Sequence, residues 1–390
     1  DINGLFLLQD NMIIGIDASR ANRDHKTGVE WYAYYIIKNL VEMDHDNDYI
    51  LYSDKPLKDD LARLCREHSN CKEMVLHWPF RRFWTLGRLS WEMVMRPPDV
   101  LFVPAHTLPL FSRAKMVNTI HDVAFMIYPQ FYSHYERLHL RWSTRFALSR
   151  AEQIITVSNF TKQEIFRYFL MAQEDKISVV YHGYDKALYH PVVDRTADSR
   201  ILDYYRLEKP YFIYIGRLES KKNIVGLLNA FRNFCQARPN DKTMLVLAGQ
   251  RSHDYAPINN LLADPIIKGR AKELGWVPEQ DLPVLLRQSM AFIYPSWYEG
   301  FGLPVIQSMA CGVPVLASRV GSLPEIGAHA ALYFDPADQD ELLDKMKQLA
   351  NDAALRRQLS QAGLKRAVKF SWSQAAAQTL EILKKSHDSP

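Results

Sequence analysis

The chain has 390 residues, too many for one ordinary hydrophobic core and suited to two domains of roughly 150–200 residues each. Hydrophobic residues make up 47% and charged residues 24% of the chain, a composition that excludes a disordered or fibrous protein. The formal net charge of +4 is too small to indicate a nucleic-acid partner, and every apolar run is shorter than the roughly 18–20 residues of a membrane-spanning helix.

The first half of the chain alternates short apolar runs with helical patterns. Short runs of β-branched residues are typical of strands buried on both faces, and their alternation with helices predicts a parallel sheet covered by helices. The predicted strands are 12–18, 49–53, 73–78, 99–104, 116–122, 153–158 and 177–183. The predicted helices are 28–43, 57–68, 132–151 and 159–170, the last of which Ser158 or Asn159 can cap.

A polar segment with two prolines, 185–210, then interrupts the alternation and predicts a crossover between domains, with a short helix at 197–205. A second alternating series follows. Its predicted strands are 211–216, 243–249, 291–295, 313–318 and 331–334, with helices at 221–238, 303–310 and 338–350. The chain ends in long helical segments, where Ser371 and Gln374 resemble a capping box for a last helix that reaches about residue 385.

The two series predict an α/β protein with two Rossmann-like, doubly wound parallel-sheet domains. The predicted parts are an N-terminal extension (1–11), an N-terminal domain (12–190), a linker or crossover (191–210), a C-terminal domain (211–370) and a C-terminal helix that crosses back to the first domain (371–390). In such folds ligands bind beyond the carboxyl ends of the strands, and two domains that face each other enclose a cleft. No GxGxxG follows the first strand, which argues against a Rossmann oxidoreductase.

The four cysteines, Cys65, Cys71, Cys235 and Cys311, form no CxxC pair and show no zinc-type spacing to histidine. This pattern predicts buried, reduced thiols in a cytosolic protein.

The stretch YIGRLESKKN, residues 214–223, combines a strand end, a glycine and a basic run that opens a helix. A helix N-terminus favours anions through its free amides and its dipole. Arg217 and Lys222 add two positive charges at the carboxyl end of a strand, which suits a diphosphate. A solvated basic turn is the alternative interpretation.

The stretch EGFGLPVIQSMACG, residues 299–312, predicts a glycine-rich loop followed by a helix, with Pro304 in the first turn and Gly312 at the exit. Gly300 and Gly302 let the backbone approach a ligand closely. Because a carboxylate repels phosphate, Glu299 is better suited to accept hydrogen bonds from sugar hydroxyls. A basic pair for phosphates together with an acid for hydroxyls predicts a nucleotide-sugar site, although Glu299 could also be a simple helix-terminal carboxylate.

In this order, the two stretches resemble the retaining glycosyltransferases of family 4, which have the GT-B fold. Gly216, Arg217 and Lys222 match the basic element of that family. Its E-x7-E element matches at Glu299 but not at the second position, where this chain has Gln307. The resemblance continues at 312–325 and, in the first half, at 27–37, 119–125, 155–162 and 179–185. It covers nearly the whole chain after Met12, and within the family it points to bacterial mannosyltransferase-like enzymes of surface polysaccharide synthesis.

The resemblance implies roles for individual residues. Arg217 and Lys222 would bind the donor diphosphate and neutralise the leaving group, as a metal ion does elsewhere, so no cofactor and no metal are expected. Glu299 would accept hydroxyls of the donor sugar, and Gln307 would hold the ribose more weakly than the usual acid. The remaining residues expected at the donor are Gly28, Gly216, Val277 (near the base), Gly300, Phe301, Gly302 and Leu303.

His121 follows a predicted strand of the first domain and is a further candidate. A lone histidine at a strand end is often a structural hydrogen bonder, and Asp122 could orient it or cap the next helix. The match to the family's His-Asp pair implies that His121 lies close to the reacting sugar. There His121 would position the sugar or stabilise charge. The family resemblance also implies retention of configuration, although no nucleophile with a paired acid stands out.

Residues 77–96 form an unusual basic and aromatic stretch. Six residues follow spacings of three and four (Phe80, Phe83, Trp84, Gly87, Trp91 and Val94), with arginines mostly off that stripe and only Glu92 opposing them. A helix packed on the first domain is one interpretation. The other is a surface for an anionic membrane and a lipid-linked acceptor.

The sequence therefore predicts a metal-independent, retaining hexosyltransferase that moves mannose from GDP-mannose to a glycan or lipid-linked glycan in O-antigen, lipopolysaccharide or exopolysaccharide synthesis. Its partners would be the nucleotide sugar, the acceptor and the membrane surface, without nucleic acid, and its location cytoplasmic or peripheral at the inner membrane face. The alternatives are a UDP-sugar donor, a nucleotide-sugar epimerase, or a catalytically degenerate sugar-binding subunit.

Overall fold

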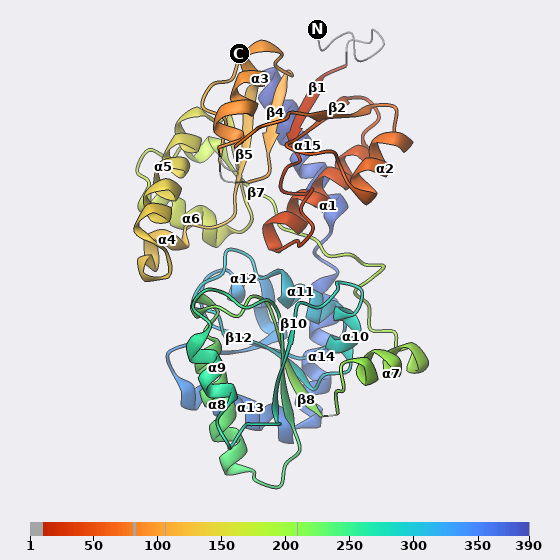
Figure 1. Cartoon of the computed structure of the whole chain (residues 1–390), viewed down its shortest axis with the longest axis vertical. Helices are drawn as coiled ribbons and strands as arrows, with labels where there is room; N and C mark the ends of the chain where they lie inside the picture. The colour runs from red at the N-terminus through yellow and green to blue at the C-terminus, as the bar shows by residue number, and fades with distance from the viewer. Residues whose placement is uncertain (1–10, 81–82, 106, 209, 390) are drawn as a thin grey trace. The chain divides into compact units, whose positions relative to one another are not determined.

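The computed structural model describes residues 11–80, 83–105, 107–208 and 210–389, and the chain forms two compact units (Figure 1). The first unit consists of Asp1–Gly183 with Ser371–Pro390, and the second of Tyr184–Phe370. Each unit is built on one parallel sheet with helices packed on it, which is a Rossmann-like α/β architecture. The extension predicted for 1–11 lies outside the described residues, apart from residue 11.

The first unit contains a seven-stranded sheet with the order β3-β2-β1-β4-β5-β6-β7. Its strands are β1 (Ile13–Asp17), β2 (Asp48–Ser53), β3 (Cys71–Val75), β4 (Val100–Val103), β5 (Lys115–Ile120), β6 (Gln153–Thr156) and β7 (Ile177–Val179). Its helices are α1 (Gly28–Met43), α2 (Asp59–Glu67), α3 (Ser90–Met95), α4 (Ala124–Ile127), α5 (His134–Arg150), α6 (Asn159–Tyr168) and α15 (Trp372–Asp388). All seven strands predicted for this half are present, and Ser158 caps α6 by accepting from the Thr161 amide.

The second unit contains a six-stranded sheet with the order β10-β9-β8-β11-β12-β13. Its strands are β8 (Tyr211–Ile215), β9 (Met244–Ala248), β10 (Ala271–Gly275), β11 (Ala291–Tyr294), β12 (Val315–Ser318) and β13 (Ala331–Phe334). Its helices are α7 (Arg195–Tyr204), α8 (Ile224–Ala237), α9 (Ala256–Leu262), α10 (Leu282–Arg287), α11 (Leu303–Ala310), α12 (Leu323–Gly327), α13 (Gln339–Asn351) and α14 (Ala353–Ala367). The sequence did not predict β10, α9, α10 or α12. The segment expected as a linker, 191–210, lies within this unit and contains α7.

The C-terminal helix α15 belongs to the first unit and packs beside α1 (Figure 1). The Trp372 ring stacks on Tyr35 of α1, with ring centroids 5.3 Å apart. A Cβ on Gly183 would lie 2.0 Å from the Trp372 amide nitrogen, so only glycine allows this approach. The capping box predicted from Ser371 and Gln374 is not formed, because the Ser371 side chain accepts no cap hydrogen bond.

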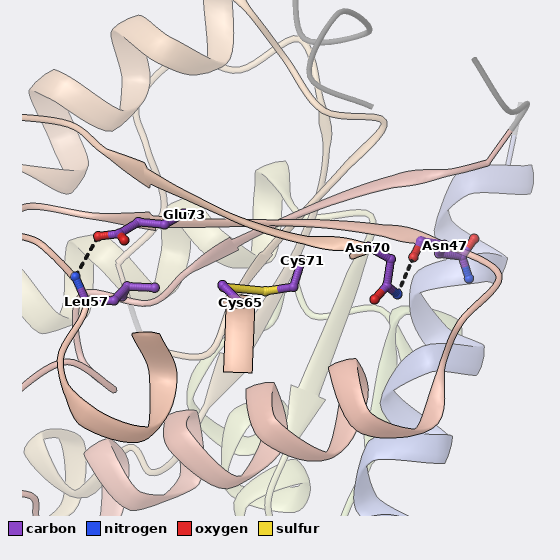
Figure 2. The surroundings of a disulfide bond; sticks show 6 residues. All are labelled: Asn47, Leu57, Cys65, Asn70, Cys71 and Glu73. Atoms are coloured by element: carbon purple, nitrogen blue, oxygen red, sulfur yellow. Dashed lines mark hydrogen bonds between the residues drawn. A yellow bond between two sulfur atoms is a disulfide. The ribbon is translucent and has the colours of Figure 1, made fainter. Parts of the chain in front are cut away.

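Cys65 in α2 and Cys71 at the start of β3 form a disulfide bond, with Cα atoms 4.7 Å apart (Figure 2). The prediction of reduced thiols is therefore wrong for this pair. The reason is local: the chain turns directly from α2 into β3, so that residues six apart in sequence come together. The Leu57 amide donates to the Glu73 carboxylate at 2.6 Å, which ties the segment before α2 to β3 (Figure 2). The other two cysteines are free and buried, as predicted: Cys235 and Cys311.

Residues 77–96 do not form the continuous apolar stripe that their spacing predicts. A π-helical turn at Thr85–Leu89 precedes α3, and the wider turn rotates the residues beyond it relative to an ideal helix. As a result Trp84 is buried while Trp91 is 64% exposed, and Glu92 is buried between two arginines, Arg88 at 2.8 Å and Arg96 at 2.6 Å. Arg81 and Arg82, two of the arginines of this basic stretch, lie outside the described residues.

Among the helices that the structure describes, none is both long and apolar enough to cross a membrane.

Candidate active site

The strand order of the second unit reverses between β8 and β11. From β8 the chain proceeds to β9 and β10 on one side, and from β11 to β12 and β13 on the other. In open α/β sheets, ligands bind at the carboxyl ends of the two strands that flank such a switch point. The loops that follow β8 and β11 carry the basic stretch and the glycine-rich stretch of the sequence, so the fold brings these two stretches together.

The loop after β8 is held close to its neighbours by glycines. Gly216 has a φ of +151°, and a Cβ on Gly249 would lie only 1.7 Å from the Gly216 carbonyl oxygen. A short 3₁₀ turn, Ser220–Lys222, and a left-handed Asn223 (φ 54°) then lead into α8. The sequence predicted that the basic run opens the helix. In the structure the run precedes the helix instead.

The loop after β11 leads into α11 and carries Glu299. Gly302, with a φ of +92°, is the residue before the helix, Pro304 lies in its first turn, and Gly312 (φ +71°) follows its end, as predicted. The Trp297 amide donates to the Lys221 carbonyl oxygen at 3.0 Å, which joins this loop to the loop after β8.

The central contact of the candidate site joins Lys222 and Glu299. The Lys222 Nζ atom lies 2.6 Å from Glu299 Oε1, and the two side chains are only 14% and 10% exposed. The ammonium group also lies 3.5 Å from the hydroxyl oxygen of Tyr294, the last residue of β11. Burial, and then the nearby Glu299 carboxylate, raise the pKa of Tyr294 well above its ordinary value, so this phenol keeps its proton. The two residues expected to bind phosphate and sugar thus share one partly buried ion pair.

Three residues that sequence reasoning did not single out hold Glu299 in place. The Ser296 hydroxyl, which is fully buried, donates to the same Oε1 atom at 2.6 Å. The amide and hydroxyl of Ser322 both donate to the Glu299 carbonyl oxygen, each at 3.1 Å. Gly321 has a φ of +60°, and a Cβ there would lie 2.5 Å from the same oxygen. The only sequence signal for the last two was their place in the family-like pattern 312–325.

The other residues predicted in this loop are buried around the ion pair or at the start of α11. Phe301 packs edge-on against Phe370, with centroids 5.9 Å apart, so its ring has a structural contact within the unit. Gln307 lies in α11 and is 8% exposed. The predicted residues Gly300 and Leu303 are also buried.

Arg217 and Val277 are in the same unit but outside the ion pair. The Arg217 guanidinium is 57% exposed and lies 3.2 Å from the Glu219 carboxylate, which is its partner in place of Glu299. Val277 is buried and follows β10, the edge strand that the sequence did not predict. Its neighbour Trp276 is 48% exposed.

Gly28 and His121 belong to the first unit. Gly28 begins α1, and a Cβ there would meet no atom within 4 Å, so packing gives no reason for a glycine. His121 is buried after β5, with Nε2 3.0 Å from the Pro104 carbonyl oxygen and the ring edge-on to Tyr32. Asp122 accepts a hydrogen bond from the Ala124 amide at the start of α4, although the residue in the cap position of that helix is Val123.

Both halves of the chain match models of glycosyltransferase families. Residues 26–188 match the model described as Glycosyltransferase Family 4, and residues 205–366 match the model described as Glycosyl transferases group 1. The chain is 33% identical over 316 residues to the O-antigen chain mannosyltransferase B of Escherichia coli, a match that covers 80% of this chain and 78% of that protein. The chain belongs to the family 4 glycosyltransferases.

One further comparison concerns the sequence and another concerns the fold. The glycosyltransferase is 26% identical over 286 residues to the serotype-specific mannosyltransferase WbdA of Escherichia coli, a match that covers 72% of this chain and 34% of that longer protein. The structure of sucrose-phosphate synthase from Thermosynechococcus elongatus superposes with a TM-score of 0.76 at 20% identity, covering 96% of this chain and 99% of that one. The fold is therefore GT-B, as the sequence predicted, with two Rossmann-like domains.

Among the described residues of this glycosyltransferase, no group of three or more His, Cys, Asp or Glu side chains is placed to hold a metal ion.

Proposed function

We propose that this glycosyltransferase transfers a hexose with retention of configuration from a nucleotide sugar to a glycan or lipid-linked glycan in surface polysaccharide synthesis. GDP-mannose is the first donor to test, because the matched relatives in Escherichia coli are named mannosyltransferases. A UDP-sugar donor is the alternative. The observation that carries the proposal is the Lys222–Glu299 ion pair at the switch point between β8 and β11.

The chemistry of this pair suits a sugar joined to a diphosphate. An ammonium group has three donor hydrogens, so Lys222 can donate to a phosphate oxygen while it keeps its contact with Glu299. A carboxylate is an acceptor only, and Glu299 has a second oxygen, Oε2, with which it can accept from a sugar hydroxyl. Lysine and glutamate together thus place a positive charge for the diphosphate beside an acceptor for the hexose.

The proposed step breaks the bond between the anomeric carbon and the diphosphate oxygen and forms a bond from that carbon to an acceptor hydroxyl oxygen. Negative charge grows on the departing diphosphate, where Lys222 and the half-exposed Arg217 side chain would stabilise it. The acceptor proton would pass to the departing phosphate on the same face of the sugar, which gives retention.

The test is a thermal-shift panel of GDP, UDP and ADP with their sugars, followed by a transfer assay with the best ligand. A ligand held by the native state raises its melting temperature. The anomeric configuration of the product, read by NMR, separates retention from inversion, and the same assay in EDTA tests metal independence. If none of the nucleotides shifts the melting temperature, the proposed donor site is wrong.

Attachment of residues 77–96 to an anionic membrane also remains part of the proposal. It concerns only the first unit, where Phe80 and Trp91 of this stretch are exposed.

A further inference from the structure

A row of aromatic rings lies along α5 in the first unit. Tyr135 stacks on His139 with centroids 6.4 Å apart, His139 lies 6.2 Å from Trp142, and Trp142 stacks on Phe146 at 5.3 Å. Tyr135 and Trp142 are 60% and 43% exposed, and Leu138 beside them is 51% exposed. Apolar side chains at such helical spacing normally face a core. Here most of them face outward.

Arginines flank this row on the exposed side of α5. Arg141 and Arg145 are both exposed, and each lies three or four residues from Leu138 or Trp142, the spacing of neighbours on a helix surface. The acidic residue of α5, Glu136, is engaged at the start of the helix, where it completes the capping box. The outward side of α5 is therefore both apolar and positively charged.

The segment 107–113 connects α5 to α3, which also carries exposed apolar side chains. The Leu110 amide donates to Ser90 of α3 at 2.7 Å, and the Ser143 hydroxyl of α5 lies 3.5 Å from the Thr107 hydroxyl. Buried residues of α3, of this segment and of α5 also belong to one hydrophobic core cluster of the first unit.

This extension adds three exposed apolar side chains. Trp91 and Met95 of α3 are 64% and 59% exposed, and Phe111 between the helices is 67% exposed. The acidic residue of α3, Glu92, is buried and neutralised by Arg88 and Arg96. We call the surface the basic apolar face; it consists of Trp91, Met95, Phe111, Tyr135, Leu138 and Trp142, with Arg141 and Arg145 beside them.

We propose that the basic apolar face, with α5 as its principal element, docks this glycosyltransferase on an anionic lipid bilayer. A helix with outward apolar side chains, aromatic rings and arginines is the type that lies in the membrane interface. Leu138 and Met95 have neither a polar group nor a ring with which to bind a glycan or nucleic acid, whereas acyl chains cover them well. The arginines match the negative charge of lipid headgroups.

The test is co-sedimentation of the full-length protein with phosphatidylglycerol/phosphatidylcholine vesicles. We expect the double variant Leu138→Ser/Trp142→Ser to lose at least about tenfold in partition coefficient. The reason is that two apolar side chains are no longer there to transfer from water into the bilayer. We expect Arg141→Gln/Arg145→Gln to lose about fivefold per charge on anionic vesicles. The matched control is Leu170→Ser, since Leu170 is an exposed leucine of the same unit, 98% exposed, outside the face.

A second measurement uses substitutions at exposed positions, where little core packing is lost. A bimane label on Leu138→Cys should shift its emission to the blue when vesicles are added, and a label on Leu170→Cys should not. The proposal is overturned if the Leu138 label does not respond, if the double serine variant sediments like the wild type, or if neutral vesicles bind equally well. The proposal rests on the membrane attachment proposed above for residues 77–96 and extends it to α5. Because no nucleotide sugar is present, the outcome is independent of the proposed transfer reaction.

Discussion

The substitution Lys222→Met tests the candidate site most directly. Methionine keeps an unbranched apolar stem beside the Tyr294 ring, from whose centroid the ammonium lies 5.6 Å, but it removes the charge. Loss of one preorganised group that stabilises transition-state charge costs about 2–4 kcal/mol, so we expect kcat to fall about 30- to 1000-fold. Removing one partner of a fully buried ion pair costs about 3–5 kcal/mol. Because this pair keeps some exposure and Ser296 still donates to Glu299, we expect a loss of about 1–3 kcal/mol in unfolding free energy.

The assay is kcat at saturating nucleotide sugar together with urea unfolding of the same preparations. The neighbouring Lys221→Met is the matched control and should leave kcat near the wild-type value. The double variant Lys222→Met/Glu299→Gln removes the uncompensated carboxylate, so it should recover most of the lost stability but none of the lost kcat. If Lys222→Met loses stability and keeps its turnover, the lysine is only a structural partner of Glu299, and the role assigned to it is refuted.

Three other variants probe the surroundings of the pair and the first unit. Ser296→Ala should lower kcat/KM for the nucleotide sugar about 10- to 100-fold, which is the worth of a hydrogen bond to a charged group, and should leave the binding of free nucleotide unchanged. The control Ser308→Ala loses a hydrogen bond within α11 and should not lower kcat/KM. Gln307→Glu should tighten nucleotide binding about fivefold in calorimetry, because a carboxylate accepts ribose hydroxyls more strongly; altered sugar preference with unchanged nucleotide affinity would show that this residue is wrongly placed. Burial, and then the charge of His121, lower the pKa of His182 well below 6.5, so the unfolded chain binds the proton first and stability falls as the pH drops below about 6.5. His182→Phe should flatten that slope, by up to about 1.4 kcal/mol per pH unit, in urea unfolding followed from pH 7 to 5; an unchanged slope would contradict the pKa shift.

The sequence predicted the central strands well because they are buried on both faces. Strands β1 and β8 consist of short β-branched or aromatic runs, and four or five of their five residues are buried. Strand β10 was missed for the opposite reason. It is the edge strand of its sheet, its residues Ala271–Gly275 are all only partly buried, and its polar sequence carries no apolar run. The π turn before α3 was also invisible, since a change in helical period leaves no mark in composition.

The sequence placed Lys222 and Glu299 beyond strand ends of one domain, but it did not indicate the residues that support Glu299. Lys222 and Glu299 could be placed because each follows a recognisable strand and because their charges suit the two ends of a nucleotide sugar. Their direct contact could not be read from the sequence, since it needs the adjacency of β8 and β11, whose last residues, Ile215 and Tyr294, are 79 positions apart.

The support of Glu299 comes from farther along the chain. Gly321 and Ser322 follow β12, the next strand of the sheet, and they reach the Glu299 backbone only because β12 lies beside β11. A side chain on residue 321 would collide with that backbone, so the glycine fixes where the carboxylate can lie. The acid of the site is thus positioned by two neighbouring strand ends, with Lys222 and Ser296 on its carboxylate and Ser322 on its carbonyl oxygen. Substituting Glu299 alone tests the acceptor for the sugar. Substituting Ser296 tests whether the position of the Glu299 carboxylate matters. Only the Ser296 variant keeps the charge of Glu299, so only it can separate geometry from charge.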